Sequence, residues 1–294
     1  MRPGPPAAAL VLACLAGAAA LPGAATGSPA ATPVLVDIRA SHHPGVDRVV
    51  LELDGALPAR IRVRYVDRLV ADGSGLPVRI AGQAVLRVEL SPAQAHDDAG
   101  RPTVPRRTAY ALPNVMTTVR AGDFEGVTTY GIGLARRTPF EVSTLRNPSR
   151  VVIDVRAGFR TERRPVFFLD QDRFVDNVEP FFVRRMRPVR PGTPATGLMD
   201  RLFAGPLPAE RRAGLRLVRS RARGYTDLTV SAGVARVRLT GGCSSGGSTV
   251  TVAGSVLPTL RHLPTVDWVK VLDPAGQTAD PTGSTDSIPA CLEP

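Results

Sequence analysis

Lysine is nearly absent from this chain of 294 residues, because Lys270 is the only one among 37 basic residues. Aromatic residues are also few, at 5% of the chain. The formal net charge of +11 is therefore carried almost wholly by arginine. A basic surface of this kind can attract nucleic acid, anionic lipid or an acidic polymer. Abundant alanine, glycine, proline and valine indicate a GC-rich genome, which is a second explanation for the arginines.

Residues with catalytic or metal-binding chemistry are scarce as well. The chain has four histidines, and no two of them have the spacing of a metal-ligand motif. The aspartates within residues 170–176 lack the glycine and the glutamate of a calcium loop. Residues 244–247, Ser-Ser-Gly-Gly, lack the flanking pattern of a nucleophile elbow or a phosphate loop. The sequence therefore predicts a protein that is not an enzyme and that uses no metal or cofactor.

Long apolar runs are missing too, since nothing beyond the N-terminus approaches the ~20 apolar residues of a membrane span. Residues 1–25 combine a charged start, an apolar core and small residues. This pattern predicts a signal peptide cleaved near Ala25 and followed by a flexible segment, 26–33. Alternatively, the residues that end at Cys14 resemble a lipobox, and a lipid on Cys14 would anchor the chain to the outer face of the membrane. Export by either route disfavours nucleic acid as a partner.

Export also bears on the interpretation of the cysteines. Removal of the signal peptide leaves Cys243 and Cys291, an even pair in an oxidising compartment. We therefore expect a disulfide between them, which would attach the C-terminal tail, rich in Pro, Gly, Ser and Thr, to its domain. Two free buried thiols are the alternative.

The length of the chain predicts two domains. Short alternating runs separated by turn residues fill residues 34–157, and no convincing helical period interrupts them. RVVLEL at 48–53 is echoed by RVVIDV at 150–155, so this domain begins and ends on similar strands. An all-β sandwich is predicted here. The arginine-rich stretch 158–164 is predicted to be a solvated linker.

Four segments of the first domain carry a family resemblance. They are DRVVLELDG at 47–55, the stretch from YVDRLV to AQAHD at 65–97, the stretch from AGDFEG to TPFEV at 121–142, and SRVVIDV at 149–155. Together they resemble the AMIN-like domain of bacterial envelope proteins. The resemblance implies a β-sandwich that catalyses no reaction. In relatives, AMIN modules help to place cell-wall amidases and secretins in the envelope by binding peptidoglycan.

Residues 165–294 mix strands with a helix. The strands begin with PVFFLD and a second strand ending in RRMRPVR, and the helical stretch TPATGLMDRLFAGP follows them. After the helix come a hairpin around Ala232-Gly233 and a last strand in VDWVKVLDP. This pattern predicts an α+β domain. The order of LFAGP and LPTVDWVKV resembles the GerMN domain of sporulation, germination and envelope lipoproteins. The resemblance implies a second helix at 249–263 and a module without catalytic activity.

Two groups of arginines are candidates for binding. Arg184, Arg185 and Arg187 lie on one strand, where alternation places Arg185 and Arg187 on one face and Arg184 on the other. A second strand places arginine at residues 60, 62 and 64, on one face. Guanidinium groups suit phosphate and carboxylate, although arginine can also simply solvate a surface.

The sequence thus predicts an exported, non-catalytic cell-envelope protein. It would bind peptidoglycan or an anionic wall polymer, or would position a partner there. The alternative is an extracellular signalling accessory, in which the GerMN-like half docks a sensor or another envelope protein.

Overall fold

The computed structural model describes residues 1–4 and 31–294. The predicted cleavage near Ala25 and the lipidation of Cys14 lie outside these residues. Residues 32–294 form one compact unit. Across the described part of the chain, no helix is long and apolar enough to cross a membrane.

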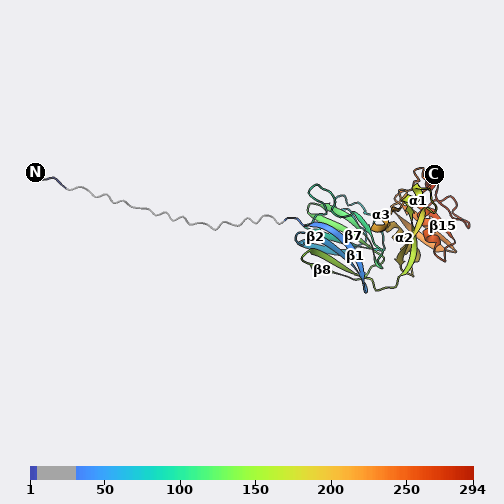
Figure 1. The fold of residues 1–294 in the computed structure, drawn as a ribbon, viewed down its shortest axis with the longest axis horizontal. Coiled ribbons are helices and arrows are strands. Elements are labelled where there is room, and N and C mark those ends of the chain that lie inside the picture. The colour runs from blue at the N-terminus through green and yellow to red at the C-terminus, as the bar shows by residue number, and fades with distance from the viewer. Residues whose placement is uncertain (5–30) are drawn as a thin grey trace. The chain divides into compact units, whose positions relative to one another are not determined.

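The first half of the unit consists of two antiparallel sheets (Figure 1). One sheet has the order β1-β2-β9-β8, with strands Val34–His43, Val46–Asp54, Ser149–Arg156 and Phe140–Leu145. The other has the order β3-β4-β7-β6-β5, with strands Arg60–Val66, Ala84–Ser91, Val127–Leu134, Val115–Phe124 and Arg107–Ala109. The prediction of a β-rich first domain is confirmed.

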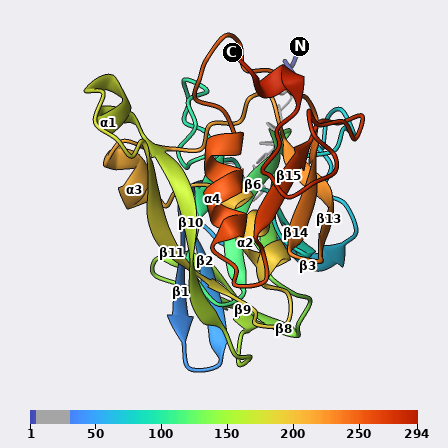
Figure 2. The same ribbon diagram turned by 90° about the vertical axis from the view of Figure 1, so that its right-hand side faces the viewer.

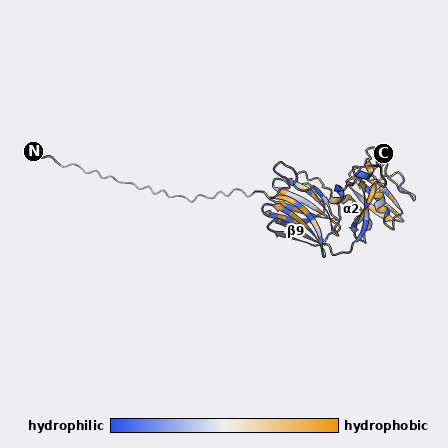
Figure 3. Ribbon diagram, viewed as in Figure 1, coloured by the Kyte–Doolittle hydropathy of each residue, from blue (hydrophilic) through white to orange (hydrophobic). Residues whose placement is uncertain are grey.

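The alternation seen in the sequence determines which side chains enter the core between the sheets. Along β2, Val49, Leu51 and Leu53 are buried while the residues between them are partly exposed. These residues pair with β9, the strand whose sequence echoes that of β2: Val49 pairs with Ile153 and Leu51 with Val151. The two similar strands are therefore neighbours in one sheet. Figure 3 shows hydrophobic residues, in orange, interspersed with hydrophilic ones, in blue, on the strands of this half.

The predicted linker 158–164 is too long at its C-terminal end. Strand β10 spans Glu162–Asp170, because Glu162 already pairs with Val189 and Arg164 with Arg187. The connection between the two halves is therefore limited to residues 157–161. The charge of the arginines disfavoured a strand in the sequence, whereas pairing with β11 satisfies their backbone groups.

The second half has two three-stranded sheets. One has the order β11-β10-β12, where β11 is Phe182–Val189 and β12 is only Leu215–Arg216. The other has the order β13-β14-β15, and its strands are Gly224–Ser231, Val234–Thr240 and Trp268–Leu272. The hairpin predicted around Ala232-Gly233 is confirmed as β13 and β14. Its helices are α1 Gln171–Val175, α2 Pro194–Ala204, α3 Pro208–Arg212 and α4 Ala253–Arg261, with a 3-10 turn at Ala290–Leu292.

Helices α2 and α4 lie between these two sheets (Figure 2). Four apolar residues of α2 form a stripe that is buried in the core of this half: Leu198, Met199, Leu202 and Phe203. Gly205 ends the helix with a positive φ of 95°, which favours glycine. Helix α4 lies inside the range 249–263 that the GerMN resemblance implied. Its buried Val256 and Leu260 join the same core.

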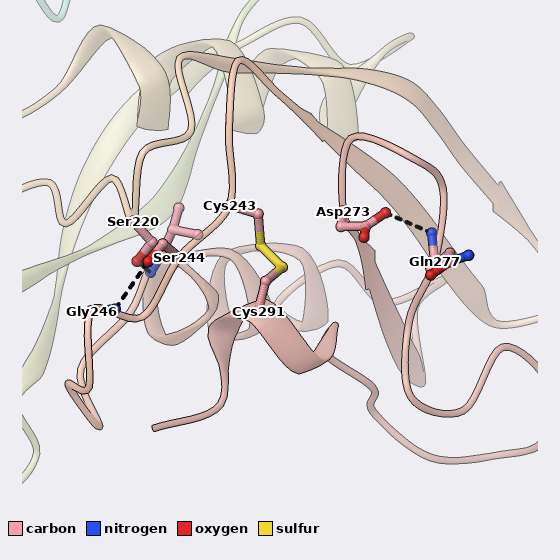
Figure 4. The surroundings of a disulfide bond; sticks show 8 residues. Ser220, Cys243, Ser244, Gly246, Asp273, Gln277 and Cys291 are labelled. Carbon is pink, nitrogen blue, oxygen red and sulfur yellow. Dashed lines mark hydrogen bonds between the residues drawn. A yellow bond between two sulfur atoms is a disulfide. The ribbon is translucent and has the colours of Figure 1, made fainter.

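The C-terminal tail is held by a disulfide and by a buried lysine. Cys243 and Cys291 are bonded, with their Cα atoms 5.7 Å apart (Figure 4). Lys270 on β15 is fully buried, and its Nζ donates to the carbonyl of Thr282 at 2.8 Å and to Asp280 at 3.3 Å. Lys270 is buried because the tail covers this face of β15 and supplies the acceptors.

Candidate functional site

Arg201 on α2 joins the second half of the unit to the first. Its side chain is only 2% exposed. The guanidinium donates to the backbone carbonyls of Tyr110, Leu112 and Pro113, all of them in the first half. Burial, and next the charge of Arg187, lower the pKa of Arg201 to about 9. At neutral pH Arg201 therefore remains charged, with its charge compensated by three carbonyl dipoles.

The loop that receives Arg201 is also fixed from within the first half. The fully buried carboxylate of Asp47 accepts hydrogen bonds from the backbone N–H groups of Asn114, at 2.6 Å, and Val115, at 2.9 Å. His42, the penultimate residue of β1, places its Nδ1 2.7 Å from the other Asp47 oxygen. Residues 110–115 are thus held through their N–H groups by Asp47 and through their carbonyls by Arg201. Such a loop is a rigid platform for the contact between the halves.

Asp200, next to Arg201 on α2, makes a second contact across the same boundary. Its carboxylate accepts from Gln83 Nε2 of the first half at 2.8 Å, and it lies 2.9 Å from the hydroxyl of Tyr225. The side chain is 4% exposed, and burial raises the pKa of Asp200 to about 6. Both partners are neutral, so neither compensates the carboxylate with a full charge.

The burial of Asp200 predicts that the stability of the folded chain depends on pH. The folded-state pKa of Asp200, about 6, lies above its ordinary value of 3.8, so the folded state binds the proton more tightly than the unfolded state. Relative to Asp200→Asn, the wild type should therefore lose up to about 3 kcal/mol of stability as the pH rises from about 3 to about 7, and nothing further above that. Urea unfolding of both proteins from pH 3 to pH 8 measures the difference. A difference that does not vary with pH would contradict this result.

Beside these contacts lies a cleft with a volume of about 670 Å³, lined by both halves. Arg79 and Arg107 line it from the first half, and Arg219 and Arg223 from the second. We call Arg79, Arg107, Arg219 and Arg223 the cleft arginines. On the wall of the cleft, the rings of Phe203 and Tyr225 stack with centroids 5.8 Å apart.

The cleft arginines have an excess of positive charge. Within residues 1–4 and 31–294, no carboxylate forms an ion pair with any of them. Asp200 is the one carboxyl group among the described residues that line the cleft. Burial, and next the charge of Arg219, lower the pKa of Arg107 to about 10, and burial also lowers the pKa of Arg219. Positive charge that is confined in this way attracts anions.

The predicted binding residues on β11 lie elsewhere, and one of them is unavailable to a partner. Arg185 and Arg187 do share a face, since both approach Glu210 of α3. Arg187, however, is 2% exposed, donates to both carboxylate oxygens of Glu210, and packs 5.5 Å from the ring centre of Phe168. The expectation that Arg187 is a surface contact is therefore wrong, because α3 covers that face. Arg184 is exposed and Arg185 is partly exposed.

The arginines of β3 are arranged as the sequence predicted. Residues 60, 62 and 64 are exposed, while Ile61 and Val63 between them pack against the core of the first half. Since β3 is at the edge of its sheet, these arginines form an open row without the walls of a cleft.

The cleft arginines were not found from the sequence. Arg79, Arg219 and Arg223 lie outside or at the margin of regular elements, and Arg107 begins a strand of three residues. No periodicity therefore marks their faces.

The described part of the chain contains no group of three or more His, Cys, Asp or Glu side chains that could hold a metal ion.

Comparison with known proteins concerns the first half. Residues 33–157 match the family model of the AMIN-like domain, in agreement with the segments that suggested it. No curated protein and no solved structure gives a significant match to the chain. The two-sheet half of this protein, residues 33–157, is an AMIN-like domain.

Proposed function

We propose that this chain is a non-catalytic, exported cell-envelope protein that binds an anionic polymer of the cell wall in the cleft between its two halves. AMIN-like domains are common in cell-envelope proteins and in peptidoglycan-binding contexts. By the same binding, the protein would position its second half, or a partner held by that half, at the wall.

The observation that carries the proposal is the set of cleft arginines without carboxylate partners. A guanidinium presents planar N–H donors that match phosphate and carboxylate groups, both of which occur in wall polymers. The cleft volume of about 670 Å³ falls within the range of ordinary ligand sites, about 300–1,000 Å³. Because the two halves supply two arginines each, the intact chain is the binding unit.

Export is supported by the bond between Cys243 and Cys291, since disulfides persist mainly in oxidising compartments. The charged and apolar start of the sequence supports it too. We further propose that residues 165–294 are GerMN-like, on the basis of the order in which α2, α4 and β15 follow one another.

Docking of another envelope protein is a second candidate function, supported by a different surface. Around α1, the side chains of Val175, Val178 and Phe174 are 73%, 49% and 40% exposed. Phe174 also packs edge-on against Phe181, at 5.5 Å between ring centres. Exposed apolar side chains close together are typical of surfaces that contact other proteins.

Sedimentation with purified cell walls tests the first function. We expect the mature chain to sediment with walls at low salt and to be released as the salt concentration rises, because contacts of solvated guanidinium groups are screened within about 8 Å at physiological ionic strength. Walls stripped of phosphate-containing polymers form a second arm. Binding lost on stripping assigns the ligand to those polymers, and binding retained assigns it to peptidoglycan carboxylates. Absence of binding to both preparations, or binding indifferent to salt, would contradict the proposal.

A further inference from the structure

We propose that Arg107 and Arg219 bind one shared oxyanion, a phosphoryl or carboxylate group, which bridges the two halves of the unit. The inference rests on the proposed function and specifies how the cleft holds an anionic group. Both residues line the same cleft, one from each half, and both are partly buried.

Like charge is the first reason. The guanidinium groups of Arg107 and Arg219 are close enough for the charge of Arg219 to lower the pKa of Arg107. Two cations drawn together from separate halves of a protein destabilise the contact between those halves unless an opposite charge lies near them. The halves are nevertheless held in contact here, by Arg201 and by Asp200.

The lack of a protein counter-charge is the second reason. Asp200, the carboxyl group on the cleft wall, is engaged by Gln83 and Tyr225 and forms no ion pair with either arginine. Its raised pKa, about 6, further reduces the negative charge it provides in mildly acidic solution. Among the residues that the structure describes, nothing therefore neutralises the pair, and an anion from solution can do so.

Pre-organised donors are the third reason. One nitrogen of Arg107 donates to the carbonyl of Arg79, and one of Arg219 donates to the carbonyl of Phe203 at 3.3 Å. Arg219 also lies 6.0 Å from the ring centre of Phe203. These contacts orient both guanidinium groups, while the remaining N–H groups of each have no acceptor in the described residues. A guanidinium has five N–H donors, so each retains enough to bind an oxyanion.

A bridging anion couples binding to the contact between the halves. Because one arginine comes from each half, the bound group opposes their separation and stabilises the folded unit by mass action. Removal of either arginine should abolish the bridge, and removal of the second should then cost little more. The effects of the two substitutions on affinity should therefore be far from additive.

The experiment measures thermal unfolding of the full mature chain in inorganic phosphate, in acetate and in chloride at equal ionic strength. We expect the melting temperature of the wild type to rise with phosphate or acetate but not with chloride. Preference for phosphate assigns the group to phosphate polymers, and an equal response to acetate assigns it to carboxylates. Arg107→Gln and Arg219→Gln should each weaken the apparent affinity at least tenfold, and the double variant little further.

Arg146→Gln with Arg160→Gln is the matched control, since both residues are exposed and neither lines the cleft. It should respond to anions as the wild type does. Without added anion, the cleft variants should be at least as stable as the wild type, because repulsion is relieved; this also shows that they fold. An equal rise in melting temperature for the wild type and the double variant would overturn the proposal, and so would additive losses. Wall binding that persists in that case would leave the broader function intact.

Discussion

Arg201→Met should destabilise the chain by about 3–5 kcal/mol, since it removes a buried charged donor and leaves its acceptors without partners. The three carbonyls of residues 110, 112 and 113 are at the boundary of the halves, where water cannot easily replace the guanidinium. Methionine retains much of the apolar stem, so the loss reports the donors more than the packing. Urea unfolding monitored by circular dichroism measures the change.

The same variant should also separate the unfolding of the two halves. Arg201 is the contact that ties α2 to the loop fixed by Asp47, so its loss weakens the coupling between the halves. Calorimetry should show one transition for the wild type and two for Arg201→Met. Arg212→Met is the control, because Arg212 is exposed on α3. A loss below about 1 kcal/mol with one transition, the range of ordinary surface substitutions, would show that Arg201 does not hold the halves together.

Cys291→Ser should cost up to about 4 kcal/mol, because the disulfide closes a loop of 48 residues and restricts the unfolded chain. The effect should appear in the second half. Trp268, the only tryptophan, lies on β15 beside the tail, and its fluorescence reports that half in urea unfolding without reductant.

Cys243→Ser should give the same loss as Cys291→Ser, and the double variant should lose no more, because all three lack the same bond. Reductant should abolish the difference between the wild type and these variants. Unchanged stability of the wild type in reductant would contradict the expected contribution of the bond.

Local periodicity explains why much of the fold was predictable. The strands of the first half alternate along one buried face, and α2 carries a stripe that enters a single core. Arg201 lies beside that stripe, where the helical period alone does not predict burial. It is buried because the other half of the unit covers it, and the period of one helix contains no information about a second covering surface.

Residues distant in sequence account for the failures in the predicted site. Alternation correctly paired Arg185 with Arg187, yet Glu210, on a helix that begins 21 residues after Arg187, converts Arg187 into a buried ion pair. The cleft arginines were missed for the same reason, since each half supplies only two of them. A site formed between halves becomes visible only when their contact is known.

One comparison tests the central claim, that the cleft is the wall-binding surface. Three double variants each lose two positive charges, at different places. They are Arg107→Gln with Arg219→Gln in the cleft, Arg184→Gln with Arg185→Gln on β11, and Arg62→Gln with Arg64→Gln on β3. Sedimentation with cell walls at one fixed ionic strength measures the affinity of each. We expect the cleft variant to lose at least tenfold and the other two less than twofold. Equal losses from all three, or the largest loss from β11 or β3, would show that net charge or another surface binds the wall and that the cleft does not.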